Sequence, residues 1–182
     1  MENASREILN AVRDLLIEGG LKAVTFAEVC KRSGFSRGGL THHFPTKVEL
    51  VEALVRQSVD ACIASFRDYV QTLPESGSKR STAYVDFMLK EPAMCSPNGH
   101  RDFHAVMIAL MHGCGRDPGE QFYQQLAKDL RGVGLSKELT DVLLTTIDGL
   151  WMQAAFLPAK EISARARCIR GQLNALIKKE LN

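Results

Sequence analysis

The chain has 182 residues, of which 45% are hydrophobic and 24% are charged, a composition typical of a globular protein with a core. No apolar run approaches the ~20 residues that cross a bilayer, and no basic-then-apolar signal sequence begins at Met1, so we expect a cytoplasmic protein without membrane contact. The formal net charge is +2, so binding to nucleic acid would depend on local placement of basic residues. Five scattered cysteines without a CxxC pair argue against a disulfide framework or a structural zinc site.

The N-terminal third contains signals for short helices. Apolar residues from Ile8 to Leu16 recur on one helical face, and Gly19-Gly20 provides a stop. The segment Thr25–Glu28 has the pattern of a capping box, in which the Thr25 hydroxyl accepts from a helix N–H and Glu28 bonds back to the Thr25 N–H. The helix that it begins is expected to end at Gly34.

Two further helix starts follow. Ser36 is placed to cap a second short helix, which is expected to end at Pro45 because proline has no backbone N–H. A second capping box, Thr46–Glu49, begins a long helix that continues to near Pro74.

The rest of the chain is also predicted to be helical, with turn-rich breaks, and no alternating strand pattern is present. The fold class is therefore all-α. We expect breaks at 74–79, 92–98, Gly113–Gly119 and Pro158, and helices at about 81–90, around Phe103–Leu110, at Phe122–Leu130, at 136–157 and at 163–181.

Two short helices joined by a turn near Gly34 predict a helix-turn-helix whose second helix enters the DNA major groove. Leu40 and Phe44 lie on its inner face, four residues apart. The residues left to face outward are Arg37, Gly38, Thr41 and either His42 or His43. Glycine costs up to ~1 kcal/mol in a helix interior, so Gly38-Gly39 is an unfavourable choice for helix stability. Because glycine has no side chain, these positions would let the helix approach a DNA backbone closely. The alternative is that glycine near a helix start simply costs little.

Lys47 is expected at the first position of the long helix. A helix N-terminus with free N–H groups and a lysine can bind a phosphate. The alternative is a solvated surface lysine.

Residues 6 to 50 resemble the DNA-binding domain of TetR-family transcriptional regulators. The resemblance is carried by Arg6, Ile8-Leu9, Leu15, Gly19, Thr25, Val29, Gly34, Ser36, Gly39-Leu40, His43-Phe44, Lys47 and Leu50. It implies an N-terminal three-helix DNA-binding domain over 1–50, followed by a helical effector-binding and dimerisation domain over 51–182. One departure is Thr41, where the family usually has a tyrosine that commonly touches a phosphate. The expected DNA-binding residues are Thr25, Ser36, Arg37, Gly38, Gly39, Thr41, His42, His43 and Lys47.

The last two predicted helices contain small residues that permit close helix packing, with Gly149 and Gly171 in their centres. The family resemblance, which includes the segment Asp148–Trp151, implies that these helices pair with their symmetry mates. A homodimer also suits a palindromic operator. The alternative is that their apolar stripes are only intramolecular core.

The C-terminal part contains methionine and aromatic residues that could line an effector pocket, since such pockets are mostly apolar and methionine adapts to varied ligands. Ordinary core packing is the alternative. The candidates are Met88, Phe103, Met107, Met111, Phe122, Trp151 and Phe156, with Met94 in the same group. A metal or redox role for Cys95, His100, His104, His112 or Cys114 is left open, because their spacing matches no metal site that we can derive.

The sequence therefore predicts a ligand-responsive repressor that binds a palindromic operator as a homodimer and is released by a small apolar or aromatic effector. The alternative is a small-molecule binding module with vestigial DNA binding. No catalytic motif is present, and we expect neither an enzyme nor a metal or cofactor.

Overall fold

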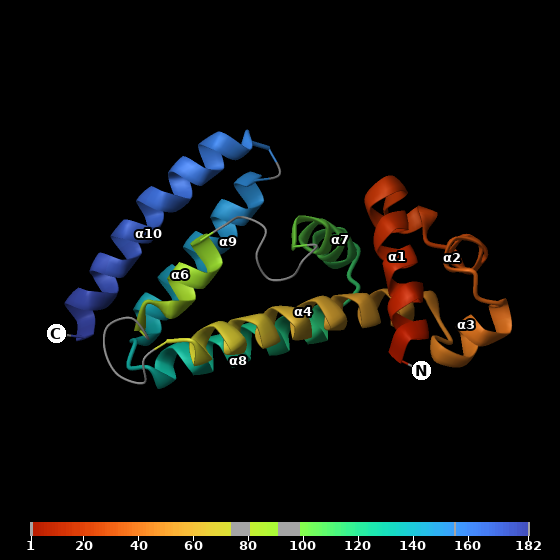
Figure 1. Cartoon of the computed structure of the whole chain (residues 1–182), viewed down its shortest axis with the longest axis horizontal. Coiled ribbons are helices and arrows are strands. Elements are labelled where there is room, and N and C mark those ends of the chain that lie inside the picture. Colours follow the sequence, from red (N-terminus) through yellow and green to blue (C-terminus); the bar gives the residue numbers. More distant parts are fainter. Residues whose placement is uncertain (1, 74–80, 91–98, 155, 182) are drawn as a thin grey trace. The chain divides into compact units, whose positions relative to one another are not determined.

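The computed structural model describes residues 2–73, 81–90, 99–154 and 156–181, and the regular secondary structure in these ranges is α-helical throughout (Figure 1). The predicted all-α fold class is confirmed. The helices are α1 Glu2–Ala23, α2 Phe26–Ser33, α3 Arg37–His43, α4 Lys47–Gln71, α6 Ala83–Lys90, α7 Gly99–Met111, α8 Arg116–Gly132, α9 Lys137–Ala154 and α10 Ala159–Leu181.

The chain forms two compact units. The first contains Met1–Ala61 and His100–Phe122, and the second contains Cys62–Gly99 and Tyr123–Asn182. α4 and α8 each contribute residues to both units. The predicted boundary at residue 50 separates a DNA-binding domain from the rest of the chain by function, whereas the two units are defined by packing. This boundary stays a prediction.

The core of the first unit is formed by α1, α2, α3, α4 and α7. Ile8, Val12 and Leu16 of α1 are fully buried together with Leu40 of α3, and apolar residues of α4 close the same cluster. α7 enters this core through Ala105 and Ala109, which are four residues apart and fully buried. Small side chains at this spacing allow α7 to lie close to its neighbours.

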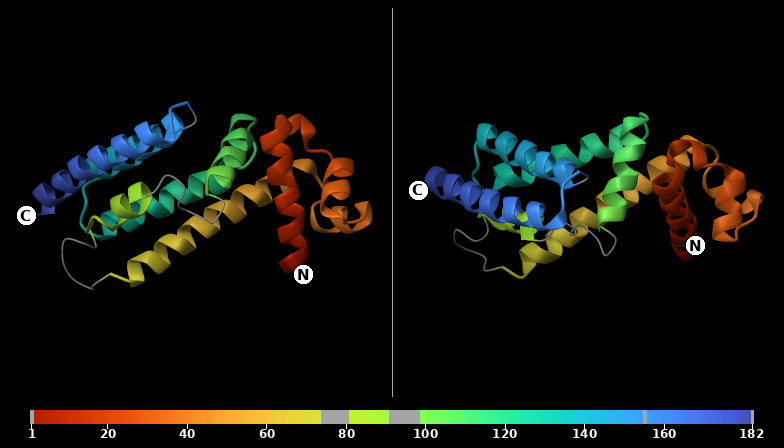
Figure 2. Two further views of the ribbon diagram at one scale, coloured as in Figure 1. Left: turned by 45° about the horizontal axis from the view of Figure 1, so that its top comes forward. Right: turned by 90° about the horizontal axis from the view of Figure 1, so that it is seen from above.

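The second unit packs α6, α9 and α10 around a separate group of apolar residues. α9 and α10 lie side by side (Figures 1 and 2). Leu143 and Ile147 of α9 and Ile177 of α10 are almost completely buried. Phe66, near the end of α4, packs against Tyr84 and Phe87, its ring 5.6 and 5.4 Å from theirs.

Several helix boundaries differ from the predicted ones. α1 continues to Ala23, although its backbone leaves helical geometry at Gly20, where φ is 65°. α8 begins at Arg116, before Phe122, because Pro118 falls within the first turn, where a missing N–H breaks no helical hydrogen bond. α10 begins at Ala159, since the Pro158 carbonyl accepts from the N–H groups of Glu161 and Ile162.

Two other helix ends also shift. α9 ends at Ala154, before the predicted residue 157, and α4 ends at Gln71. Within the residues described, no helix is long and apolar enough to cross a membrane.

Candidate nucleic-acid interface

Local caps define the two short helices. Thr25 precedes α2, and its hydroxyl accepts from the Glu28 N–H at 3.2 Å. α2 ends at Gly34, whose φ of 76° lies in the left-handed region that favours glycine and whose N–H donates to the Cys30 carbonyl. Ser36 then caps α3 by accepting from the Gly39 N–H at 3.1 Å.

The predicted capping box at Thr25 forms only in part. The Thr25 N–H donates to the Ala23 carbonyl at 3.0 Å, so Glu28 is not its partner. The chain turns tightly between α1 and α2. Because of this turn, a backbone carbonyl and not the Glu28 side chain accepts the hydrogen bond from the Thr25 N–H.

α3 has one buried face and one exposed face. Leu40 is fully buried against the core of α1 and α2, which fixes the rotation of the helix. Arg37, Gly38 and His42 are exposed, and Thr41 and His43 are half-buried beside them. The helix therefore presents to solvent three of the residues that the sequence assigns to DNA, and exposes Gly39, Thr41 and His43 only in part.

The two glycines of α3 meet little in their own chain. A Cβ added at Gly38 would have no heavy atom of the described residues within 4 Å, and one at Gly39 would lie 3.4 Å from the Ser36 hydroxyl. Neither glycine is needed for packing within the protomer. A requirement for glycine at position 38 would have to come from a molecule outside the chain.

Side chains of this surface make contacts with aromatic rings. The Arg37 guanidinium lies over the ring of Phe26, 5.9 Å from its centroid, within the range of cation–π attraction. The rings of His42 and His43 pack edge to face at 5.5 Å. Sequence reasoning missed the contact with Phe26, because no periodic pattern relates these two positions.

The hydroxyl of Thr41 faces its own helix. It lies 2.9 Å from the Arg37 carbonyl and 3.2 Å from the Gly38 carbonyl and donates to this part of the backbone. The Thr41 hydroxyl proton is thus already used within α3 in the free protein.

Lys47 does not extend freely from the start of α4. It is half-buried, and its ammonium group donates to the Leu21 carbonyl near the end of α1. A cation at a helix C-terminus interacts favourably with the helix dipole. This contact ties α4 to α1, and the role of Lys47 in phosphate binding stays a prediction.

Basic residues are concentrated around the two short helices. Residues 22–47 contain five Lys or Arg and one Glu, a formal net charge of +4, which exceeds the +2 of the whole chain. One of the five, Arg32, forms a 2.7 Å ion pair with Glu18 of α1. Hydrogen bonding to Arg32 lowers the pKa of the Glu18 carboxyl. The local positive charge needed for contact with phosphates is present.

The predicted effector residues are distributed over both units. Met88 and Trp151 line one cavity of about 10 Å³ in the second unit, together with Leu89, Leu150, Ala154, Ile162 and Ala166. This volume suffices for about one water molecule. Phe103, Met107, Met111 and Phe122 belong to the first unit. Met111 and Phe156 are 81% and 78% exposed. One shared effector site stays a prediction.

The cysteine and histidine candidates do not form a cluster among the residues described, where no group of three metal-ligating side chains occurs. Cys114 is buried, and His104 and His112 are exposed. Cys95 and the side chain of His100 lie outside the described residues, as does Met94.

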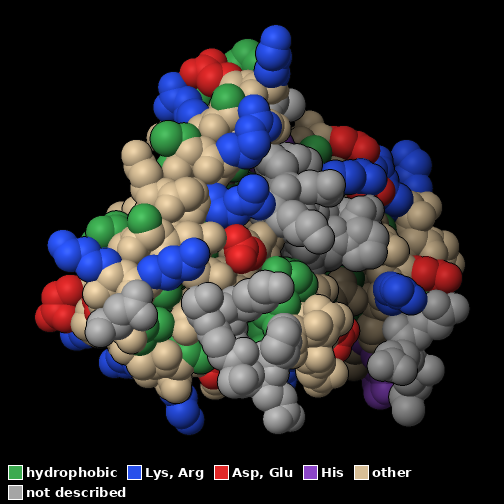
Figure 3. Space-filling model, turned by 60° about the vertical axis from the view of Figure 1, so that its left-hand side comes forward, with side chains coloured by type: hydrophobic (Ala, Val, Ile, Leu, Met, Phe, Trp, Pro, Cys, Tyr) green, Lys and Arg blue, Asp and Glu red, His purple; other side chains and the backbone are tan. Residues whose placement is uncertain are grey.

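The outer faces of α9 and α10 combine small and apolar residues. Val142, Met152 and Leu176 are 48%, 44% and 46% exposed. Among the residues that the structure describes, a Cβ added at Gly149 or Gly171 would meet nothing within 4 Å. Figure 3 shows hydrophobic side chains among Lys and Arg side chains on the face turned toward the viewer.

Residues 8–54 match the sequence model of the bacterial regulatory proteins of the tetR family. The transcriptional regulator UidR of Escherichia coli (strain K12) is 30% identical over 113 residues, which are 61% of this chain and 52% of the relative. The chain thus spans about half the length of that relative.

Two further similarities extend this result. The transcriptional repressor KstR2 of Mycobacterium tuberculosis (strain ATCC 25618 / H37Rv) is 35% identical over 66 residues, 36% of this chain and 33% of that protein. The structure of the multidrug binding protein EbrR complexed with malachite green has a TM-score of 0.75 at 16% identity, covering 93% of this chain and 96% of EbrR. The latter likeness establishes the fold.

Proposed function

Since the chain belongs to the TetR family of bacterial regulatory proteins, we propose that it is a repressor that binds a palindromic DNA operator as a homodimer in the cytoplasm. Membership of this family makes the chain a regulator and not an enzyme, as the sequence predicted. The observation that carries the proposal is the outward face of α3, where Arg37, Gly38 and His42 are exposed within a segment of net charge +4.

DNA binding is tested by selecting duplexes from a random library with the wild-type protein and measuring their affinity by mobility shift. Arg37→Ala is expected to relax one position of the selected sequence, because a lost bidentate guanine contact costs about 1–3 kcal/mol. Arg116→Ala removes an exposed arginine at the start of α8 and serves as the matched control. Selection of no duplex by the wild type, or equal effects of both variants, would contradict this role of α3.

We infer that the dimer forms through α9 and α10. Support comes from the exposed apolar residues of these helices and from Gly149 and Gly171, which leave room that the described part of their own chain does not fill. An interface between two copies would cover these positions in a two-fold arrangement, in which each residue occurs twice.

Cys168 provides a direct test, because it is the exposed cysteine among those described and lies on α10. A short bis-maleimide is expected to link two wild-type chains and to leave Cys168→Ser unlinked. Linkage that persists in Cys168→Ser would show that another cysteine reacts. A wild type that stays unlinked and sediments as a monomer would contradict the dimer.

The effector is proposed to be apolar or aromatic, to bind the helical C-terminal part and to release the DNA. Support comes from the methionine and aromatic lining of the cavity at Met88 and Trp151 and from the dye bound by EbrR. A cavity of about 10 Å³ has to enlarge to admit such a ligand. Malachite green is therefore a suitable first probe, with thermal stability and operator affinity as the two measurements.

A small-molecule binding module with vestigial DNA binding is the second candidate. Thr41 favours it, since its hydroxyl donates within α3 and a threonine is shorter than the tyrosine of the family. The same mobility-shift experiment separates the two candidates. Ligand binding without affinity for any selected duplex would favour the second.

A further inference from the structure

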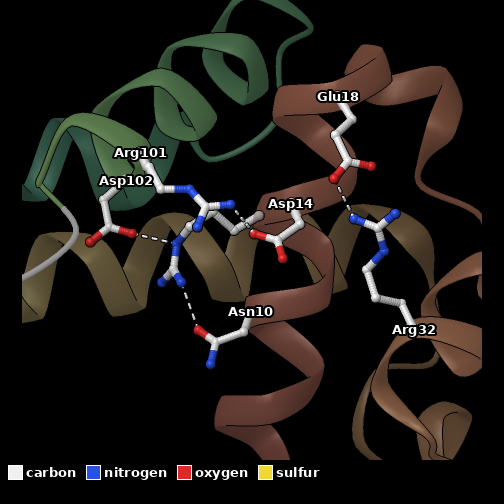
Figure 4. Close-up of polar contacts among 7 residues, drawn as sticks. Asn10, Asp14, Glu18, Arg32, Arg101 and Asp102 are labelled. Carbon is white, nitrogen blue, oxygen red and sulfur yellow. Dashed lines mark hydrogen bonds and ion pairs between the residues drawn. The ribbon is translucent and has the colours of Figure 1, made fainter.

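Three basic side chains around the two short helices have partners of different kinds. Arg32 forms its ion pair with Glu18 (Figure 4), and the Lys47 ammonium donates to a backbone carbonyl of α1. The guanidinium of Arg37 instead lies over the ring of Phe26, 5.9 Å from the ring centroid. Within the described ranges of the chain, no carboxylate forms an ion pair with Arg37. The partner of Arg37 is therefore an aromatic face and not a charge.

The two residues occupy equivalent places in neighbouring helices. Phe26 is the first residue of α2, and Arg37 is the first residue of α3. A helix N-terminus carries a partial positive charge, so the dipole of α3 does not attract the guanidinium. The face of an aromatic ring is negative and attracts a cation within about 6 Å of its centroid. The attraction that orients Arg37 thus comes from α2.

The ring of Phe26 is anchored in the protein. Phe26 is half-buried and packs against the apolar core that includes Val29 of α2 and Leu40 of α3. Arg37 itself is exposed. An exposed arginine has many rotamers, and contact with a ring that is held in place reduces their number before any DNA is bound.

The contact with Phe26 leaves the hydrogen-bonding groups of Arg37 available. A carboxylate would accept hydrogen bonds from the guanidinium and would have to be displaced by DNA, whereas a phenyl ring has no lone pair to be displaced. An arginine recognises guanine through two N–H donors in a fixed fork. A side chain that is already oriented loses less conformational entropy when it binds. The ring can therefore favour base recognition without competing with it.

We propose that Phe26 is a specificity-determining residue, which orients Arg37 for bidentate recognition of one guanine in the operator. This inference rests on the proposed repressor function and adds a residue of α2 to the surface that reads the sequence. Phe26 is a positioning residue, since it acts through Arg37 and not on the base. Exposed cation–π contacts are weak, so loss of the ring should reduce discrimination at this guanine by about 2- to 5-fold.

The DNA experiment measures discrimination at one operator position. The quantity is the ratio of two affinities: for a duplex selected by the wild type, and for the same duplex changed at the position that Arg37→Ala relaxes. Phe26→Leu, which keeps an apolar side chain in the core, should lower this ratio by about 2- to 5-fold. Phe26→Tyr keeps the ring and should keep the ratio.

Phe35→Leu is the matched control, because Phe35 is another half-buried phenylalanine on the same core. Its loss can weaken binding to both duplexes but should leave their ratio unchanged. In the Arg37→Ala background, Phe26→Leu should also have no effect on the ratio, since the group that it orients is absent.

Three results of the DNA experiment would overturn the role of Phe26. They are an unchanged ratio in Phe26→Leu, an equal loss in Phe26→Leu and Phe35→Leu, and a loss from Phe26→Leu that persists in the Arg37→Ala background. If Phe26→Leu does not fold, Phe26→Met, which is also apolar and lacks a ring, is judged by the same criteria.

NMR of the full chain without DNA tests the contact separately. Protons over an aromatic ring are shifted upfield, so the side-chain signals of Arg37, assigned with Arg37→Ala, should move downfield in Phe26→Leu and stay in place in Phe35→Leu. Arg37 signals that do not move in Phe26→Leu would overturn the contact. A wild type that selects no duplex refutes the proposed function and the specificity role with it, whereas the NMR experiment still decides whether Phe26 positions Arg37.

Discussion

Gly149→Leu separates the stability of the protomer from the stability of the dimer. Gly149 lies inside α9, and a Cβ built at this position meets no heavy atom of the described residues within 4 Å. The substitution should therefore leave the fold of the protomer intact, and it removes a glycine that disfavours a helix by up to ~1 kcal/mol. Any loss must then arise at a surface that a second chain covers.

The size of that loss follows from the symmetry of the interface. Extra side-chain volume in a packed region costs about 1–3 kcal/mol per site. A two-fold interface contains each site twice, so the dimer should lose about 2–6 kcal/mol. The dissociation constant of the dimer should therefore be about 30-fold to about 20,000-fold higher than that of the wild type.

Sedimentation across a concentration series, together with circular dichroism, measures both quantities. Gly149→Leu should be a folded monomer at concentrations where the wild type is a dimer, and operator affinity should fall with it. Gly132→Leu is the control, since Gly132 ends α8 and also has nothing within 4 Å of an added Cβ. A folded, dimeric Gly149→Leu protein with full DNA binding would refute the assignment of the interface to α9.

Three further outcomes are expected. Gly115→Ala should cost about 1–3 kcal/mol more than Gly113→Ala in urea unfolding, because both glycines have positive φ but only at Gly115 would the Cβ lie 2.7 Å from a valine of α4. Burial raises the pKa of the Asp148 carboxyl above its usual value of 3.8, although Tyr123 donates a hydrogen bond to it, so folding favours the protonated form. As the pH rises from 3.8 through the raised pKa, the wild type should therefore lose stability relative to Asp148→Asn. Unfolding free energies of the two proteins that change in parallel with pH would contradict this. Lys47→Ala should lower affinity for all duplexes and reduce the salt slope by ~1, whereas a change in thermal stability with an unaltered salt slope would limit Lys47 to its contact with the end of α1.

Local chemistry made the DNA-binding helices predictable. The Ser36 cap and the left-handed Gly34 depend only on neighbouring residues, so the start of α3 and the end of α2 could be assigned before the fold was known. The spacing of Leu40 and Phe44 likewise determined which side of α3 faces inward. The resemblance to a family added the expected role of this surface, which periodicity alone does not supply.

Long-range contacts were decided by the tertiary structure alone. Lys47 was expected to face phosphate, and only the arrangement of α1 and α4 shows its ammonium group on the Leu21 carbonyl. The Arg101–Asp14 pair joins residues 87 positions apart, and nothing in the sequence around either residue indicates its partner. Helix caps and amphipathic faces arise from interactions within a few residues, whereas the partner of a charged side chain depends on which distant helix the packing of the core places beside it.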